Sequence, residues 1–204
     1  VGMVRQVNED ACLDIQEAGL WAVADGMGGH AAGDFVSNLI IDSLRRVPVE
    51  SELPVYLQAL RAVLARVNQA VRDEAARRGV SMMGSTLVLL AARGSQASCM
   101  WVGDSRLYRL RDGSLSLLSH DHSYVQDLVD SGALSEEEAR SHPMGNIVTR
   151  AVGAQDDLEL ADLELGKRFV SDLLGGESVR IEGAAPWLAA AKLPENDQAR
   201  LTIR

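Results

Sequence analysis

Hydrophobic residues recur at helical intervals in two segments near the start of this chain. Between residues 33 and 47 the apolar side chains fall on one side of a helix, and between 57 and 71 they recur at steps of three and four. This spacing is typical of amphipathic helices that turn one face toward a core. Pro54 near the start and Gly79 beyond the end mark the limits of the second helix. We predict two core-facing helices, neither of which needs a functional role.

Strand patterns occupy most of the remaining apolar sequence. Continuous apolar runs occur at 20–24, 85–92 and 97–102, and alternating or short apolar segments at 107–111, 115–118, 158–165 and 201–203. Runs of this length and composition are typical of buried strands. Asp112 and Gly113 form a strong hairpin turn between two of them. The middle of the chain therefore predicts antiparallel sheet.

Two short helices are predicted after the hairpin. Residues 124–129 have a helical pattern that Gly132 ends. Ser135 and Glu138 form a capping box, which starts another helix. Because helices and strands come in blocks instead of strict alternation, the pattern favours a layered α+β fold over a parallel doubly wound sheet.

Composition and charge narrow the class of protein. The chain has 204 residues, 47% of them apolar, which suits one domain over 1–204. Its net charge is −9, and no block of Lys and Arg stands out, which argues against nucleic-acid or anionic-membrane binding. An anionic substrate would need a local positive centre, such as a metal ion or a single arginine.

Targeting signals and metal-type cysteine pairs are not evident. No apolar run approaches the roughly 18 residues of a membrane span, and no signal-peptide pattern opens the chain. Cys12 and Cys99 do not have metal-ligand spacing. We therefore expect a cytoplasmic protein. The chain begins at Val1 already close to a motif, which leaves open that residues precede it.

Asp25 is the first candidate for chemistry. It follows the apolar run 20–24 directly and enters a turn in which Gly26, Gly28 and Gly29 remove crowding side chains. A carboxylate and bare backbone carbonyls would then face a cavity, an arrangement that suits a hard divalent cation. The alternative is a strand that ends in a glycine turn with a solvated aspartate, and this segment alone does not decide between them.

Other acidic residues share this position beside strand-like segments: Glu9, Asp10, Asp104, Asp172 and Asp197. Such carboxylates can converge at one sheet edge, where they would raise one another's pKa unless cations relieve the repulsion. No His or Cys accompanies them at ligand spacing, which favours Mg²⁺ or Mn²⁺ over Zn²⁺. For Asp104 a simple turn residue is the alternative.

A pair of metal ions would suit phosphate chemistry. Two ions about 3.5–4 Å apart can activate a bridging water for in-line displacement at phosphorus. Arg5 adds a planar guanidinium that matches phosphate oxygens, with a surface salt bridge as the alternative.

Five motifs in order carry a resemblance to a known family. Residues 5–11 (Arg-Gln-Val-Asn-Glu-Asp-Ala), 23–30 (Val-Ala-Asp-Gly-Met-Gly-Gly-His), 83–86 (Met-Gly-Ser-Thr), 102–106 (Val-Gly-Asp-Ser-Arg) and several short segments over 121–153 form the series. The chain resembles the metal-dependent serine/threonine protein phosphatases of the 2C class, the PPM family, in their compact bacterial form. The match covers about residues 1–166.

The resemblance implies a fold. It predicts two central antiparallel β-sheets packed as a sandwich and flanked by α-helices on both outer faces, a four-layer αββα arrangement. A metal cluster would lie in the cleft at the ends of the sheets. Residues 120–146 would form a flap, which we expect to contribute to substrate choice. We expect a monomer.

The resemblance also implies a metal site with two, or three, Mn²⁺ or Mg²⁺ ions. Asp25 would bridge two ions, and the Gly26 carbonyl would bind one of them. Asp104 would help to form a third site. Asp172 and Asp197 align with the two late metal-binding aspartates of the family.

Further roles follow from the same resemblance. Glu9 and Asp10 would hold metal-bound water, and Arg5 would bind the substrate phosphate. Met27 stands where eukaryotic members have a histidine that is a candidate general acid, and His30 is not assigned that role. A structural or surface role is expected for His30, and local packing of the flap for the other histidines. These are His120, His122 and His142.

The match weakens after residue 166. Residues 169–174 lack the glycine that the family places after its aspartate, and the stretch between Asp172 and Asp197 is short. Two explanations stay open. Loops are missing from the chain as given, or the protein is truly shortened and its metal binding is damaged.

The function implied is that of a Mn²⁺- or Mg²⁺-dependent enzyme acting on phosphoserine and phosphothreonine in proteins. Water activated at the binuclear centre would attack phosphorus directly, without a phosphoenzyme. The expected partners are a bacterial Ser/Thr kinase and its phosphorylated substrates. Two alternatives remain: a non-catalytic pseudophosphatase that binds a phosphoprotein, and a partner-switching phosphatase that acts on an anti-sigma antagonist.

Overall fold

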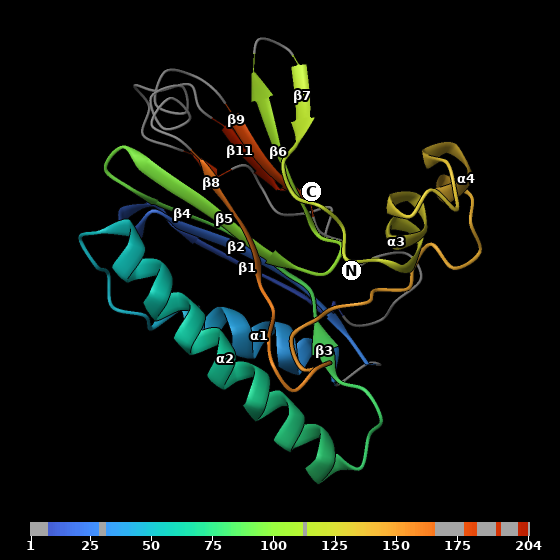
Figure 1. The fold of residues 1–204 in the computed structure, drawn as a ribbon. Coiled ribbons are helices and arrows are strands. Elements are labelled where there is room, and N and C mark those ends of the chain that lie inside the picture. The colour runs from blue at the N-terminus through green and yellow to red at the C-terminus, as the bar shows by residue number, and fades with distance from the viewer. Residues whose placement is uncertain are drawn as a thin grey trace.

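Two β-sheets lie face to face, and two helices cover the outer face of the first sheet (Figure 1). The structure is a computed structural model that describes residues 8–28, 32–111, 114–165, 178–182, 191–192 and 200–203. Antiparallel sheets with helices confirm the α+β sandwich expected from the sequence.

The first sheet has the strand order β1-β2-β4-β5-β8, with β3 paired to β2, and all its pairings are antiparallel. Its strands are β1 (Asp10–Ile15), β2 (Leu20–Met27), β3 (Gly84–Ser85), β4 (Leu87–Arg93), β5 (Gln96–Val102) and β8 (Ala161–Leu165). The predicted runs at 85–92 and 97–102 thus lie at the centre of this sheet.

The second sheet has the order β10-β11-β9-β6-β7. Its strands are β6 (Arg106–Arg111), β7 (Ser114–Leu117), β9 (Ser178–Glu182), β10 (Ala191–Lys192) and β11 (Arg200–Ile203). The antiparallel pair β6–β7 confirms the predicted hairpin strands, while the turn residues 112–113 lie outside the described part. The pairing of β11 with β9 is parallel, which differs from the all-antiparallel sheet that we expected.

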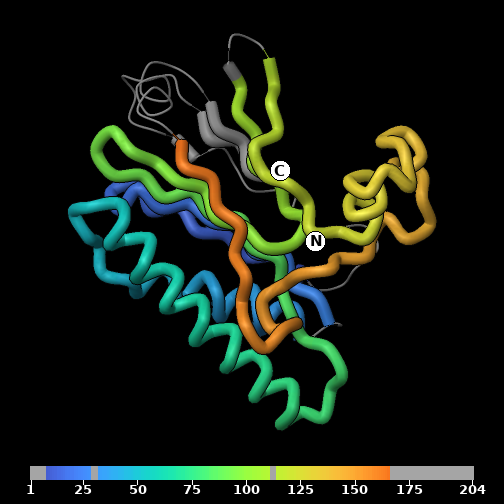
Figure 2. The backbone as a smooth tube through the Cα atoms, viewed as in Figure 1, coloured from blue at the N-terminus to red at the C-terminus, as the bar shows by residue number. Residues whose placement is uncertain are grey.

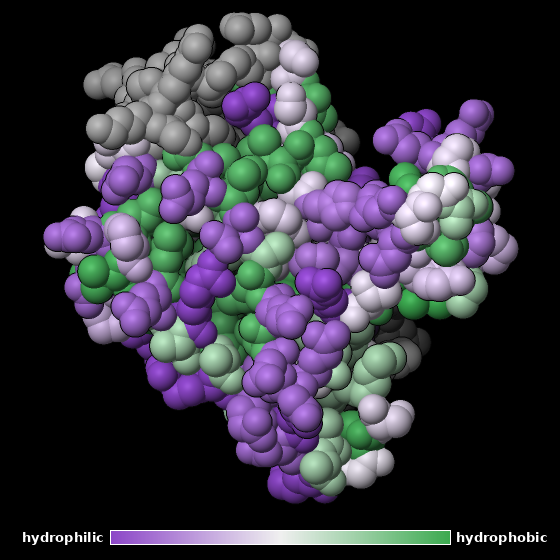
Figure 3. Space-filling view, in the orientation of Figure 1, coloured by the Kyte–Doolittle hydropathy of each residue, from purple (hydrophilic) through white to green (hydrophobic). Residues whose placement is uncertain are grey.

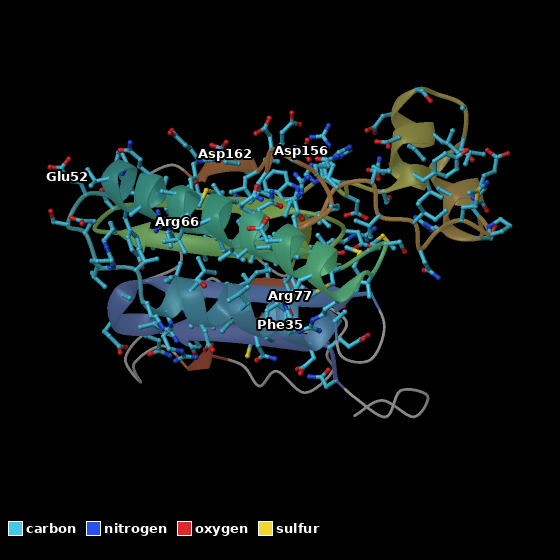
Figure 4. The ribbon with its side chains drawn as sticks, turned by 90° about the horizontal axis from the view of Figure 1, so that it is seen from below. Phe35, Glu52, Arg66, Arg77, Asp156 and Asp162 are labelled. Carbon is cyan, nitrogen blue, oxygen red and sulfur yellow. The ribbon has the colours of Figure 1, made fainter. Side chains whose placement is uncertain are left out.

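Both long helices are confirmed. They are α1 (Gly33–Arg45) and α2 (Leu53–Arg78), and α2 ends at Gly79 in the left-handed conformation with φ +67°. Figure 4 shows them side by side across the sheet, with Asp156 and Asp162 along one side of α2. The Arg61–Asp162 ion pair, at 2.9 Å, ties α2 to β8.

The remaining helices are short: η1 (Gln16–Ala18), α3 (Tyr124–Asp130) and α4 (Glu136–Arg140). The predicted capping box is present, because Ser135 and Glu138 each bond the other's backbone N–H. In the described part of the chain, helices cover the outer face of the first sheet only, so the second outer layer remains an expectation.

Two apolar cores lie on opposite faces of the first sheet. In β4, Leu87 and Leu89 pack with the helices, whereas Val88 and Leu90 face the second sheet, and none of the four is exposed. Successive side chains of a strand point to opposite faces. Burial on both faces therefore explains why these strands have continuous apolar runs rather than the alternation of a half-exposed sheet.

Two strand boundaries differ from the sequence prediction. β2 does not end at residue 24 but continues to Met27, because Gly26 pairs with Ser85 of β3 and its N–H donates to the Glu9 carbonyl at 3.0 Å. β8 begins at Ala161 rather than at residue 158. Residues 158 and 160 instead pack their leucine side chains against the helix-side core.

The register of β1 and β2 is set by the tight connection between them. Asp10 lies opposite Asp25, and Ile15 lies opposite Leu20. Gly19 ends η1 with φ +51°, and a Cβ atom at this position would collide with the Ala92 carbonyl. Only glycine therefore suits this turn.

The described helices include none that is long and apolar enough to cross a membrane.

Candidate functional site

Three acidic residues come from strand ends at one edge of the first sheet. Asp10 opens β1 directly opposite Asp25 near the end of β2. β5 runs in the same direction as β2, because both pair antiparallel with β4. Asp104, two residues beyond the end of β5, therefore lies at the same edge as Asp25. Asp25 and Asp104 thus line one cavity, and Asp10 lies opposite Asp25 in the sheet. The predicted convergence of the whole set of carboxylates stays a prediction.

The backbone of Asp25 is held by two hydroxyl residues. Its N–H donates to Thr86 Oγ1 at 3.3 Å, and its carbonyl accepts from the Thr86 N–H at 2.9 Å and from Ser85 Oγ at 2.9 Å. Thr86 Oγ1 also lies 2.6 Å from Ser105 Oγ, in the turn that carries Asp104. Thr86 thus connects the two acidic segments.

Glycine is required beside Asp25 by close packing. A Cβ atom on Gly26 would collide with the carbonyl of Gly33 at the start of α1, and it would lie 2.7 Å from the Glu9 carbonyl oxygen. Gly26 is therefore needed for the approach of the helix to the strand. From the sequence, Gly26 was expected to have a different role, that of clearing space around the Asp25 carboxylate.

A cavity of about 770 Å³ opens between this edge and the flap. Figure 2 shows the chain leaving β7, forming the flap and returning toward β8, and in Figure 3 the flap protrudes beside the body of the molecule. Asp25 and Asp104 line one part of the cavity. Other lining residues are Ser105, Arg106, Leu117, Asp121, Ser123, Val125, Gln126, Val129, Glu136, Ala139, Arg140, His142, Gly145 and Asn146.

The electrostatics of the cavity are set by burial and by one ion pair. Burial first, and then the negative charge of Asp121, raise the pKa of Asp104 above its usual value. Arg106 forms a bidentate pair with Asp121, with N–O distances of 2.6–3.0 Å. The hydrogen bonds to Asp121 raise the pKa of Arg106 above its usual value.

Each flap histidine makes a local contact, in line with the packing role expected for it. His120 Nε2 lies 2.7 Å from Asp130 Oδ2. His122 Nδ1 accepts from the Gly103 N–H, and burial lowers the pKa of its imidazole. His142 Nδ1 accepts from a flap backbone N–H at 3.2 Å, but this residue also lines the cavity.

Arg5, His30, Asp172 and Asp197 lie outside the described residues. Glu9 is described and is only 8% exposed. Within the described ranges, no three His, Cys, Asp or Glu side chains come close enough to form a metal-binding group. The complete ligand set expected from the sequence therefore remains a prediction.

The donor atoms that are described fit a hard divalent cation. Asp25 and Asp104, which carry carboxylate oxygens, line one cavity, and Gly26 follows Asp25 in β2. Oxygen donors of this kind suit Mg²⁺ or Mn²⁺. The raised pKa of Asp104 reflects burial and negative charge, both of which a bound cation would offset.

Four residues that support this site had no role predicted from the sequence. Ser85 and Thr86 hold Asp25, and Arg106 and Asp121 pair at the cavity wall. All four stand in the motifs that carried the resemblance. Their position in those motifs was the signal that could have found them. Their bonding partners, however, lie 15 to 61 residues away in sequence and become evident only in the fold.

Comparison with known proteins identifies relatives. The family model of protein phosphatase 2C matches residues 4–172. The serine/threonine protein phosphatase PstP of Mycobacterium tuberculosis is 33% identical over 204 residues. That alignment covers 95% of this chain but 38% of PstP, so the chain spans well under half the length of this relative.

Solved structures show the same similarity. PppA, described as a key regulatory component of T6SS in Pseudomonas aeruginosa, is 64% identical with a TM-score of 0.74, over 81% of this chain and 68% of that chain. The catalytic domain of PstP in complex with two manganese ions is 36% identical with a TM-score of 0.63, over 80% and 68% of the two chains.

Proposed function

The chain belongs to the protein phosphatase 2C family, and we propose that it hydrolyses phosphoserine and phosphothreonine in proteins. The observation that carries this proposal is the meeting of Asp25 and Asp104, from strands far apart in sequence, in one cavity. A cavity of about 770 Å³ has room for a phosphorylated side chain together with neighbouring residues of its protein.

We propose that Mn²⁺ or Mg²⁺ is the cofactor, as the two manganese ions of the PstP catalytic domain support. Asp25 and the Gly26 carbonyl would hold the ions with Asp104, together with Asp172 and Asp197 from outside the described residues. When bound, the ions would offset the negative charge of the acidic edge (Asp10, Asp25 and Asp104) and activate water for attack on phosphorus.

The protein's own groups orient the reaction. The bonds from Ser85 and Thr86 hold the backbone of Asp25, which lines the cavity. Glu9 and Asp10 would accept hydrogen bonds from water at the edge of β1. Arg5 would bind the substrate phosphate with its planar guanidinium.

The partners follow from the same relatives. PstP is named a serine/threonine protein phosphatase, which supports phosphorylated proteins as substrates and a bacterial Ser/Thr kinase as the opposing enzyme. The 64% identity with PppA supports a regulatory role connected with a T6SS. The pseudophosphatase and anti-sigma alternatives find no support in these relatives. A monomeric, single-domain protein in the cytoplasm remains our prediction.

Phosphate release from a phosphothreonine peptide tests this function. We expect turnover in millimolar Mn²⁺ and its loss in chelator. Asp25→Asn should lower kcat/KM about a thousandfold or more, because a metal-bridging carboxylate is worth several kcal/mol to the transition state.

Asp14→Asn is the matched control. Asp14 lies on β1 with its side chain exposed, opposite Trp21 and away from the acidic edge. This variant should keep wild-type turnover. Robust turnover without metal, or no turnover by the wild-type protein at any Mn²⁺ concentration, would contradict the proposal.

A further inference from the structure

We propose that His122 is a positioning residue that holds the Gly103–Asp104 turn through its Nδ1 atom and so couples the flap to the metal site. The metal part of this inference rests on the proposed function. The contact itself stands on the geometry alone. No role in the reaction was assigned to His122 from the sequence.

Two hydrogen bonds join His122 to Gly103 in opposite directions. The Gly103 N–H donates to His122 Nδ1 at 3.1 Å, and the His122 N–H donates to the Gly103 carbonyl at 2.9 Å. The His122 carbonyl in turn accepts from the Thr149 N–H at 2.9 Å. One residue thus ties the start of the flap both to the turn after β5 and to the segment by which the chain leaves the flap.

The turn that His122 holds is closely packed on the other side. Gly103 has φ +101°, and a Cβ atom there would lie 2.7 Å from the Thr86 side chain. Thr86 hydrogen-bonds to Asp25. A shift of Gly103 would therefore move Asp104, its direct neighbour, and press on the residue that holds Asp25.

The imidazole is itself held in place. Trp101 stacks on His122 with ring centroids 6.3 Å apart and an angle of 15° between the planes. The Trp101 indole N–H donates to the His120 carbonyl at 2.7 Å. His120 contacts Asp130 at the end of α3. The stack with Trp101 orients the imidazole, and its Nδ1 atom, as the hydrogen-bond acceptor, holds the Gly103–Asp104 turn.

Two substitutions distinguish the contribution of the Nδ1 acceptor from that of the imidazole ring. His122→Phe keeps a flat ring for the stack with Trp101 but has no acceptor. His122→Asn loses the ring but places an amide oxygen close to the position of Nδ1. His122→Leu serves as a second variant without an acceptor, should the phenyl ring prevent folding.

Amide hydrogen exchange, measured residue by residue by NMR on the metal-free protein, reports on the contact directly. Loss of one hydrogen bond should speed exchange at the Gly103 amide about tenfold in His122→Phe, and less than about twofold in His122→Asn. His142→Phe is the control. It removes an imidazole acceptor elsewhere in the flap and should leave Gly103 exchange unchanged.

Mn²⁺ affinity, measured by calorimetry, reports on the coupling. We expect the weakest-bound Mn²⁺ to lose about fivefold in affinity in His122→Phe and little in His122→Asn. The Mn²⁺ concentration for half-maximal turnover should rise by the same factor, with KM for a phosphothreonine peptide nearly unchanged.

Three outcomes would overturn the inference. Both variants could match the wild type, both could be equally weakened, or Gly103 exchange could rise without a change in Mn²⁺ affinity. Failure of the proposed function would look different, because the wild-type protein would then show no turnover while the exchange experiment still decided whether Nδ1 holds the turn.

Discussion

The first sheet and the flap are built in opposite ways. In β2 and β4 most apolar side chains are wholly buried, with helices on one side and the second sheet on the other. In the flap, neither α3 nor α4 has a buried residue. The sheet is held by packing. The flap is held by end caps, by the Arg106–Asp121 and His120–Asp130 contacts, and by the hydrogen bonds at its two ends.

The two walls of the cavity therefore differ in rigidity. Asp25 belongs to the packed sheet, where tight packing limits the movement of its backbone. The opposite wall comes from a segment with few buried contacts, and such segments open at low free energy. A rigid edge with Asp25 and Asp104 can thus face a wall that adapts to whatever binds in the cavity.

The largest expected effect tests the packing of the sheet. Leu89→Ala should lower the free energy of unfolding by about 3–4 kcal/mol, because Leu89 is fully buried and its loss leaves a cavity. Val125→Ala in α3 should cost less than about 1 kcal/mol, since Val125 is only partly buried. Urea denaturation measures both. Similar losses in the two variants would contradict the contrast between sheet and flap.

A smaller effect is expected where the flap joins the sheet. Asp121→Ala should cost about 2 kcal/mol, because it leaves half-buried Arg106 without its bidentate partner. A double-mutant cycle with Arg106→Ala isolates the pair. The second substitution should add little once Asp121 is gone, and fully additive losses would show that the pair does not contribute.

Removal of a cap should act on the flap alone. Ser135→Ala deletes the capping box of α4 and should lower local stability by about 1 kcal/mol. Hydrogen exchange at the α4 amides should speed up, while the urea midpoint stays near that of the wild type. A matching fall in global stability would mean that α4 unfolds together with the sheet.

The smallest expected effect has the opposite sign. Asp104 has a raised pKa, so its ionisation above that pKa costs the folded state free energy. In chelator, Asp104→Asn should therefore raise the melting temperature at neutral pH. The gain should vanish as the pH falls below the ordinary carboxyl value of 3.8, where both states are protonated. Melting curves between pH 3 and 8, taken with wild type and variant, check this.

The sequence predicted helices and strands correctly wherever the spacing of the apolar residues matched the faces that the fold buries. α2 has apolar side chains at helical steps and glycine at its end, and β4 and β5 have apolar runs that two buried faces explain. The capping box of α4 depends on two residues three positions apart, so it too was predictable. Local signals were sufficient for these elements.

Features that depend on distant partners were not predictable in this way. β2 extends past Asp25 because Glu9, just before β1, and Ser85 of β3 supply partners for Gly26, which no local pattern shows. The pairing of Arg106 with Asp121 joins two motifs that were noted separately. Asp25 and Asp104 were predicted to converge, and the cavity they share supports that interpretation, but their roles toward metal remain predictions.

The connection between β1 and β2 has a consequence at the opposite end of the sheet. Asp10 and Asp25 share one face only because Ile15 and Leu20 are matched across this short link. Insertion of a single residue at Gly19 would slide one strand by one place and turn one of the two carboxylates to the helix side. The acidic edge, about 17 Å away, is therefore as sensitive to the length of this loop as to the acids themselves.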